Sequence, residues 1–418
     1  MPGSAQTERA DLDLLGGPEA EHVLRAVLGA EGAELVGWAT HAVHHRPGVG
    51  VTVGWTVTWR TATGTGQDYL LGSTAPLPES GGTTGVQQVR VDGSTVHVWR
   101  HPSDPALPGL IAASSVDVLA TLIGERPRAL DLVTYRPMRR AVLRAHLTDR
   151  VVYLKVVRPH TAEMLLQRHT MLADAGVPVA PARLVADGVL VLEEVPGRPL
   201  TLALAADGAA DVDPATVTDL LDRLPAAAVG LPTRPAWSAR LDHYTQAAVA
   251  AVPDAADRIQ RVAAEAAELR DSTDPGPIVP THGDLHDQNL FFDGAHVVGL
   301  LDVDAVGPGH RVDDLACLLG HLTVLPALAP QRYPDVPGTV RRWAEAFGRT
   351  VDPVALHARA AAVVISLIAG ARREDGVDWL PDAHSRIAAA EALVTTARNL
   401  RELSSSAPSP LIDGDECC

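Results

Sequence analysis

The segment THGDLHDQN at residues 281–289 has the residue types that phosphoryl transfer requires. A loop at this place can present the Asp284 carboxylate to a substrate hydroxyl, and Asn289 follows five residues later. Two short apolar runs on either side of an Asp-Gly pair at 293–294 predict a hairpin, and the second run delivers Asp302 at its end. Amide and carboxylate oxygens are ligands of hard cations, so Asn289 and Asp302 are predicted to converge on a metal ion. A positioned base together with metal ligands that bridge phosphate oxygens makes up the machinery of phosphoryl transfer.

A single lysine, Lys155, lies in the strand-like run VVYLKVVRP at residues 151–159. The other 34 of the 35 basic residues are arginine. One interpretation is a stray lysine in an arginine-rich composition. The other is that a compact ammonium on a slim stem reaches phosphate oxygens in a tight cleft, which a planar guanidinium does less well.

The charge of the chain restricts its partners. The net charge of −16 argues against a general nucleic-acid binder. Residues 1–200 carry 20 acids and 18 bases, whereas residues 201–418 carry 31 acids and 17 bases. A field of this sign in the C-terminal half attracts a cationic substrate and Mg²⁺. An acidic surface that only aids solubility is the alternative.

The composition indicates a globular protein of two or three domains. The chain has 418 residues, of which 46% are hydrophobic and 21% are charged. The first residues lack the basic start and apolar core of a secretory signal. The longest apolar run, at 360–371, is too short to span a bilayer and is predicted to be a buried helix. Three cysteines fit a reducing compartment, so we expect a cytoplasmic protein.

Hydrophobic periodicity divides the chain into a β-rich and a helical part. Before residue 200, β-branched and aromatic runs alternate with period two between Gly-rich turns, which predicts small antiparallel sheets. After residue 200, Ala- and Leu-rich helical patterns dominate, with a β-rich island at 278–303. Strands are expected at 51–60, 68–73, 130–135, 141–147 and 151–157, as a hairpin within 85–100 that turns at 91–94, and as two strands within 183–197. Helices are expected at 18–32, 114–123 and 161–176, between 214 and 270 with an interruption at 231–235, and from the island to about 402.

The motif HGDLHDQN, followed by LLDVD and DDLA, resembles the aminoglycoside phosphotransferase/choline kinase family, which has a protein-kinase-like fold. The resemblance implies that Asp284 is the catalytic base and that Asn289 and Asp302 hold Mg²⁺. It further implies that His282 braces the catalytic loop and that Asp314 is a buried structural residue at a helix start.

The resemblance also gives Lys155 a role. In a kinase-like N-lobe, the third strand supplies a lysine to the α- and β-phosphates of ATP, paired with a glutamate of the next helix. Glu163, near the start of the helix that follows Lys155, is the predicted partner. The alternative is that Glu163 is a helix-start acid favoured by the helix dipole.

The turn that should cover the phosphates departs from the kinase pattern. It reads YRPMRRA and contains no glycine. Arg136, Arg139 and Arg140 can clamp the triphosphate with their guanidinium forks in place of backbone N–H groups. An exposed basic turn is the equal alternative.

Three further positions follow from the resemblance. The run LVLEEVPGRPL resembles the inter-lobe hinge of the family, where backbone groups of Glu194 and Val195 would contact adenine. His310 departs from the family pattern and is expected to alter hydrogen bonding around the metal ligands. Asp304 is a secondary candidate ligand, because strand alternation would direct it to the same side as Asp302.

Together these patterns predict an α+β, bilobal protein-kinase-like fold. We expect a β-rich N-terminal extension at 1–125, an N-lobe at 126–196, a helical C-lobe at 197–403 and a disordered tail at 404–418. The arrangement of the extension resembles that of maltokinase-like sugar kinases.

The predicted function is ATP- and Mg²⁺-dependent transfer of a γ-phosphate to a hydroxyl of a small molecule. The expected acceptors are an aminoglycoside, a sugar, an amino sugar or an amino alcohol, and neither nucleic acid nor a membrane is an expected partner. A kinase that modifies a protein or peptide side chain and a nucleotide-binding pseudokinase are the alternatives.

Overall fold

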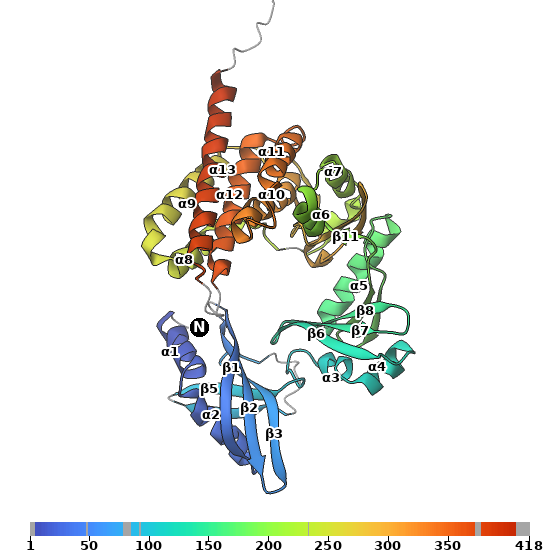
Figure 1. The fold of residues 1–418 in the computed structure, drawn as a ribbon, viewed down its shortest axis with the longest axis vertical. Coiled ribbons are helices and arrows are strands. Elements are labelled where there is room, and N and C mark those ends of the chain that lie inside the picture. Colours follow the sequence, from blue (N-terminus) through green and yellow to red (C-terminus); the bar gives the residue numbers. More distant parts are fainter. Residues whose placement is uncertain are drawn as a thin grey trace, which may run out of the picture. The chain divides into compact units, whose positions relative to one another are not determined.

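The computed structural model describes residues 5–46, 49–77, 85–91, 93–232, 234–372 and 378–406. The chain forms two compact units (Figure 1). The first contains Met1–Gln167 and Pro181–Glu194, and the second contains Arg168–Ala180 and Val195–Cys418. The described content is β-rich in the first unit and mainly helical in the second, which confirms the predicted α+β class.

The first unit begins with two helices that cover a five-stranded antiparallel sheet in the order β1-β2-β3-β5-β4 (Figure 1). Alternate residues of β2, from Val51 to Val57, are buried in one cluster with Leu15 and Leu24 of the helices. The indole nitrogen of Trp55 donates a hydrogen bond to the carbonyl of Leu15 at 3.0 Å, which fixes helix and sheet together. The elements are α1 (Ala5–Gly16), α2 (Ala20–Ala30), β1 (Glu34–Arg46), β2 (Gly50–Thr61), β3 (Gly64–Ser73), β4 (Gln87–Val91) and β5 (Ser94–Arg100).

The second sheet of this unit has the order β6-β7-β8-β10-β9 and is also antiparallel. One face packs on α3 and α4 through residues such as Leu110 and Leu119, and the start of α5 packs Ala162 and Leu165 against Val157. The bounds are α3 (Gly109–Ala113), α4 (Val116–Ile123), β6 (Ala129–Arg136), β7 (Arg140–His146), β8 (Val151–Val157), α5 (Pro159–Asp174), β9 (Ala182–Ala186) and β10 (Val189–Glu193).

The second unit is built around α12 (Pro353–Ile368), which is buried along most of its length and packs against α8, α9, α10 and α13. Two small sheets, β11-β13-β14 and β12-β15, also belong to this unit. Strands β12, β13 and β14 fall in the β-rich island predicted at 278–303. The helices are α6 (Leu200–Asp207), α7 (Ala215–Asp222), α8 (Leu241–Ala251), α9 (Ala256–Asp271), α10 (Arg311–Leu328), α11 (Val336–Phe347) and α13 (Leu380–Ser406). The strands are β11 (Arg198–Pro199), β12 (Ile278–Thr281), β13 (Leu290–Asp293), β14 (His296–Leu300) and β15 (Gly307–His310).

The apolar segment Pro353–Ala371 is long and apolar enough to cross a membrane, with a mean hydropathy of 1.8. However, 72% of its apolar stretch is buried inside the protein. Its environment is therefore that of a core helix, as the sequence predicts for residues 360–371.

The elements that differ from the sequence prediction include helix α1, strand β1 and the end of helix α13. Helix α1 is not predicted, because its few apolar residues do not form a clear stripe. Strand β1 is not predicted either, because register shifts between Leu35 and Gly37 and between Thr40 and Ala42 interrupt its alternation. Helix α13 continues to Ser406, so the predicted start of the tail at residue 404 is wrong, and the rest of the predicted tail lies outside the described residues.

Candidate active site

The loop that carries the predicted catalytic residues is held at its start by Asp314. The backbone N–H groups of His282 and Gly283 each donate to a different oxygen of this carboxylate, both at 2.8 Å. Asp314 lies in the first turn of α10 and is buried, and the burial raises its pKa. Gly283 has φ +77°, and a Cβ here would lie 2.7 Å from the carbonyl oxygen of Ala305, so only glycine fits.

His282 ties the loop to the end of the hairpin. Its side chain is fully buried, and Nε2 lies 2.9 Å from the carbonyl oxygen of Leu301. A carbonyl only accepts, so Nε2 carries the proton and donates. Within the described residues, the buried Nδ1 has no hydrogen-bond partner. These contacts agree with the predicted role of His282 as a brace of the loop, which stays a prediction.

The Asn289 side chain is oriented by both hydrogens of its amide. Nδ2 donates to the carbonyl oxygen of Asp284 at 3.0 Å and to Nε2 of His286 at 3.1 Å. The backbone carbonyl of Asn289 accepts from the N–H of Leu301 at 2.9 Å, which joins the loop to the strand β14 side of the hairpin. With the amino group used in this way, the Oδ1 atom is the part of the side chain left to act as a metal ligand.

Asp302 has an unusual backbone conformation. It follows β14 with φ 52° and ψ 49°, in the left-handed region that non-glycine residues rarely adopt, and it begins the 3-10 turn η4 (Val303–Ala305). Such conformations are concentrated at functional sites. The alternation argument for Asp304 is wrong, because Asp302 and Asp304 lie in this turn and not in a strand. Asp304 instead lies near the guanidinium of Arg168, whose pKa is lowered by burial and raised in part by that carboxylate.

The side chain of Asp284 has a partner that the sequence does not reveal. The indole Nε1 of Trp237 donates to Oδ1 of Asp284 at 3.1 Å. Trp237 stacks on Tyr244 with ring centroids 5.3 Å apart, and the guanidinium of Arg240 lies 5.0 Å and 5.1 Å from the centroids of these two rings. An aromatic wall with one cation therefore stands next to the predicted base.

Lys155 occupies the predicted third strand of the second sheet. It lies in the middle of β8, opposite Val142 of β7 and Leu190 of β10, and its side chain is only 8% exposed. Helix α5 begins at Pro159, two residues after β8 ends. Glu163 lies on an exposed face of α5, so its pairing with Lys155 stays a prediction.

The turn between β6 and β7 is held by a residue for which the sequence predicts no such role. Asp104, in the Pro-rich connector, accepts hydrogen bonds from the backbone N–H of Met138 at 2.8 Å and from the hydroxyl of Tyr135 at 2.7 Å. Met138 has φ 59°, so this turn is held in a tight conformation without glycine.

Burial raises the pKa of the Asp104 carboxyl. Of the three predicted triphosphate clamps, Arg136 and Arg139 are exposed and Arg140 is half-buried. The turn is thus firmly held and two of its three arginines are exposed, which agrees with both interpretations of these residues.

The predicted hinge residues Glu194 and Val195 and the predicted position His310 also lie among the described residues. One of the places where the chain passes from one unit to the other lies between Glu194 and Val195, and their contact with adenine stays a prediction. Nδ1 of His310 lies 2.8 Å from the carbonyl oxygen of Gly276, so this histidine fixes the connection before β12, and its predicted effect on the metal ligands stays a prediction.

Residues 139–333 match the protein family described as the phosphotransferase enzyme family. No curated protein sequence matches the chain. This match confirms the predicted family resemblance and the predicted enzyme class, a phosphotransferase, for residues 139–333. The matched segment contains Lys155, Asp284, Asn289 and Asp302.

Several solved structures are similar to the chain. One is aminoglycoside-3'-phosphotransferase of type VIII, with 23% identity and a TM-score of 0.41, covering 60% of this chain and 97% of that one. A second is a thermostable mutant of aminoglycoside phosphotransferase APH(4)-Ia in complex with ADP and hygromycin B, with 13% identity and a TM-score of 0.47, covering 68% and 98%. A third is a choline/ethanolamine kinase family protein from Mesorhizobium loti, with 16% identity and a TM-score of 0.45, covering 72% and 96%.

Proposed function

Because residues 139–333 belong to the phosphotransferase enzyme family, we propose that the chain is an ATP- and Mg²⁺-dependent kinase of a small hydroxyl-bearing molecule. The observation that carries this proposal is the arrangement of the loop around Asp284. Its carboxylate is positioned by Trp237, its backbone carbonyl by Asn289, and the start of the loop by Asp314. Phosphoryl transfer depends mainly on such positioning and on electrostatic stabilisation.

The acceptor hydroxyl would be oriented by Asp284. Its Oδ1 accepts the hydrogen bond of Trp237, which leaves the lone pairs of Oδ2 to accept the hydroxyl proton. A base held by a fixed donor has one oxygen directed at the substrate, so the reacting oxygen is aligned without loss of further conformational freedom.

The residues present fit a Mg²⁺ ion. Asn289 offers an amide oxygen and Asp302 a carboxylate, the hard ligands that Mg²⁺ takes together with substrate phosphates. The strained backbone of Asp302 supports this assignment, because strain persists where a function requires it. When bound, the ion would neutralise charge that develops on the phosphate oxygens.

The nucleotide would be bound through Lys155, whose buried ammonium suits the α- and β-phosphates. Similar proteins crystallised with ADP support a nucleotide as the donor. We propose further contacts from Arg136, Arg139 and Arg140 to the triphosphate, and from the backbone at Glu194 and Val195 to adenine, in a cytoplasmic enzyme.

The wall beside Asp284 favours a neutral, hydroxyl-rich acceptor such as a sugar. The faces of sugars pack on aromatic rings, and Trp237 and Tyr244 provide such rings. The fixed positive charge of Arg240 over both rings would repel a polycationic acceptor. This observation ranks sugars above aminoglycosides, although similar proteins were solved with hygromycin B and with spectinomycin.

ADP release in the presence of Mg²⁺ tests the proposal, with neutral sugars, amino sugars, amino alcohols and aminoglycosides offered in parallel. The proposal expects a sugar to raise ADP release at least tenfold above the rate in water, and expects Asp284→Asn to abolish the increase. Binding of ATP without release in any reaction would favour the pseudokinase alternative. Transfer only to a peptide hydroxyl would favour the protein-kinase alternative.

A further inference from the structure

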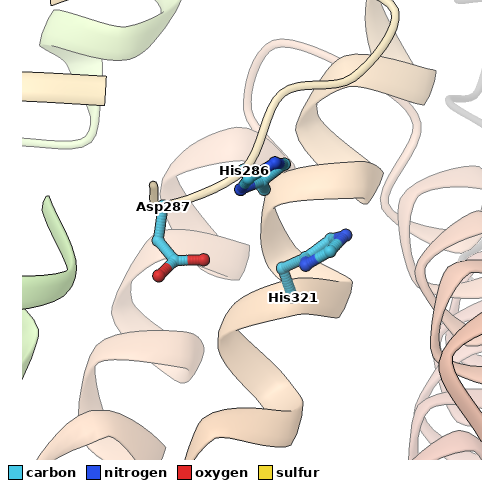
Figure 2. Close-up of side chains that lie close together, drawn as sticks. All are labelled: His286, Asp287 and His321. Atoms are coloured by element: carbon cyan, nitrogen blue, oxygen red, sulfur yellow. The ribbon is translucent and has the colours of Figure 1, made fainter. Parts of the chain in front are cut away.

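We propose that His286, Asp287 and His321 form a binding site for a transition-metal dication such as Zn²⁺, separate from the Mg²⁺ ligands Asn289 and Asp302. One ligand atom of each of the three side chains lies within 4.8 Å of the other two. Figure 2 shows the two neighbouring loop residues and the histidine that α10 supplies. Two imidazoles and one carboxylate are the ligand set that Zn²⁺ accepts and that Mg²⁺ does not prefer.

Each member of the cluster is held in place by the fold. The ring of His286 stacks on that of His321 with centroids 4.9 Å apart and an interplanar angle of 23°. Asp287 is 3% exposed, and its Oδ2 accepts the hydroxyl hydrogen of Thr201 at 2.7 Å, so that Oδ1 is available as a ligand. The ligand atoms of bound zinc lie about 3.3 Å apart, so the three side chains would close inward by about 1 Å.

A second observation points to a ligand at this place. The Nε2 atom of His321 is enclosed and has no hydrogen-bond partner within the described residues. A buried polar atom without a partner is costly, and native proteins nearly always provide one. A metal ion at the cluster would supply that partner.

Occupation of this site would disturb Asn289, an inference that rests on the proposed function. His286 Nε2 accepts a hydrogen bond from the Asn289 amide at 3.1 Å. If the metal binds Nε2, its lone pair is used, and if the metal binds Nδ1, Nε2 carries the proton and cannot accept. Metal binding at either nitrogen breaks the hydrogen bond that orients the Asn289 amide. The transition metal and Mg²⁺ would therefore weaken each other's binding.

Titration of the metal-free full-length protein with Co²⁺, followed by visible absorption, tests the site directly. We expect a tetrahedral Co²⁺ band at one equivalent that Zn²⁺ displaces. His321→Phe, which keeps a stacking ring without nitrogens, and Asp287→Asn, which can still accept from Thr201, should each weaken Co²⁺ binding at least tenfold. The control His310→Gln changes a histidine of the same unit outside the cluster and should leave binding unchanged.

Equal Co²⁺ binding by the parent protein and both folded variants would overturn the proposal. The antagonism is tested by Mn²⁺ binding to the ADP complex, which we expect Zn²⁺ to weaken in the parent protein and not in His321→Phe. If Zn²⁺ weakens Mn²⁺ binding equally in both, the coupling through His286 is wrong. A protein that binds Co²⁺ at the cluster but releases no ADP with any acceptor would refute the proposed function and retain the metal site.

Discussion

The indole nitrogen of Trp237 lies 3.1 Å from Oδ1 of Asp284. The proposed base is therefore positioned by a residue that lies 47 positions earlier in the sequence. Trp237→Phe keeps the ring stacked on Tyr244 and removes the N–H donor. We expect kcat to fall about tenfold, the equivalent of one hydrogen bond to a charged group, with little change in the KM for ATP.

Trp379→Phe, a half-buried tryptophan that packs on the helical core, is the control and should leave both parameters unchanged. An unaltered kcat in Trp237→Phe would show that the indole acts only in packing.

Asp302 combines a proposed metal ligand with a strained backbone. Asp302→Gly relieves the positive φ and removes the carboxylate, so we expect the free energy of unfolding to stay the same or rise by up to about 1 kcal/mol while ADP release is lost. Urea denaturation and the ADP assay measure the two effects on the same preparation. A variant that retains activity would exclude Asp302 as a ligand.

Lys155 is predicted to require an ammonium. Lys155→Arg keeps the charge but enlarges a side chain that is 8% exposed, so the planar head cannot take the same place and ADP release should fall at least a hundredfold. Arg183→Lys, an exposed exchange of the two cations on the neighbouring strand β9, should have no effect. Full activity of Lys155→Arg would favour the interpretation of Lys155 as a stray lysine.

Asp104 accepts hydrogen bonds from Tyr135 and from the backbone of Met138 and Ala106. Asp104→Ala leaves these donors without a partner in a buried place, and we expect the free energy of unfolding to fall by about 2–4 kcal/mol. Asp104→Asn can keep part of the network and should lose less. Denaturant titration of the two variants distinguishes them, and equal stability of Asp104→Ala and the parent protein would contradict the contacts.

His357 should make stability depend on pH. It lies buried in α12 with Nδ1 2.8 Å from the carbonyl oxygen of Pro353, and burial lowers its pKa below the ordinary value of 6.5. Because the pKa in the folded state is lower than in the unfolded state, its contribution is present above about pH 6.5 and is lost as the pH falls further. His357→Gln should therefore lose less stability than the parent protein between pH 7 and 5, as measured by thermal unfolding.

Much of the catalytic loop is predictable from the sequence because its determinants are local. The Asp-Gly pair gives the hairpin between β13 and β14, and the period-two run around Lys155 gives β8. The partners of these residues are not local. Trp237 reaches Asp284 from 47 residues away, and Asp104 reaches Met138 from 34 residues away.

The conformation of Asp302 shows a second limit. An apolar run that ends in LLDVD continues the alternation of a strand on paper, yet the chain leaves the strand at Leu300 and enters a left-handed residue and a 3-10 turn. No pattern in residue type distinguishes these outcomes, because the turn packs closely against a distant segment: a Cβ at Gly283 would lie 2.7 Å from the carbonyl oxygen of Ala305.

The N-terminal sheet shares a small apolar cluster with the turn that carries the proposed phosphate contacts. Leu71 and Trp99 of that sheet are buried with Ala106 of the connector and Met138 of the turn. A chain that lacks the first hundred residues would lose Leu71 and Trp99, two of the four buried members of this cluster, and Met138 would become exposed to solvent. The extension is therefore an inseparable part of the catalytic chain, and a shortened recombinant version beginning at the second sheet should be prone to aggregate.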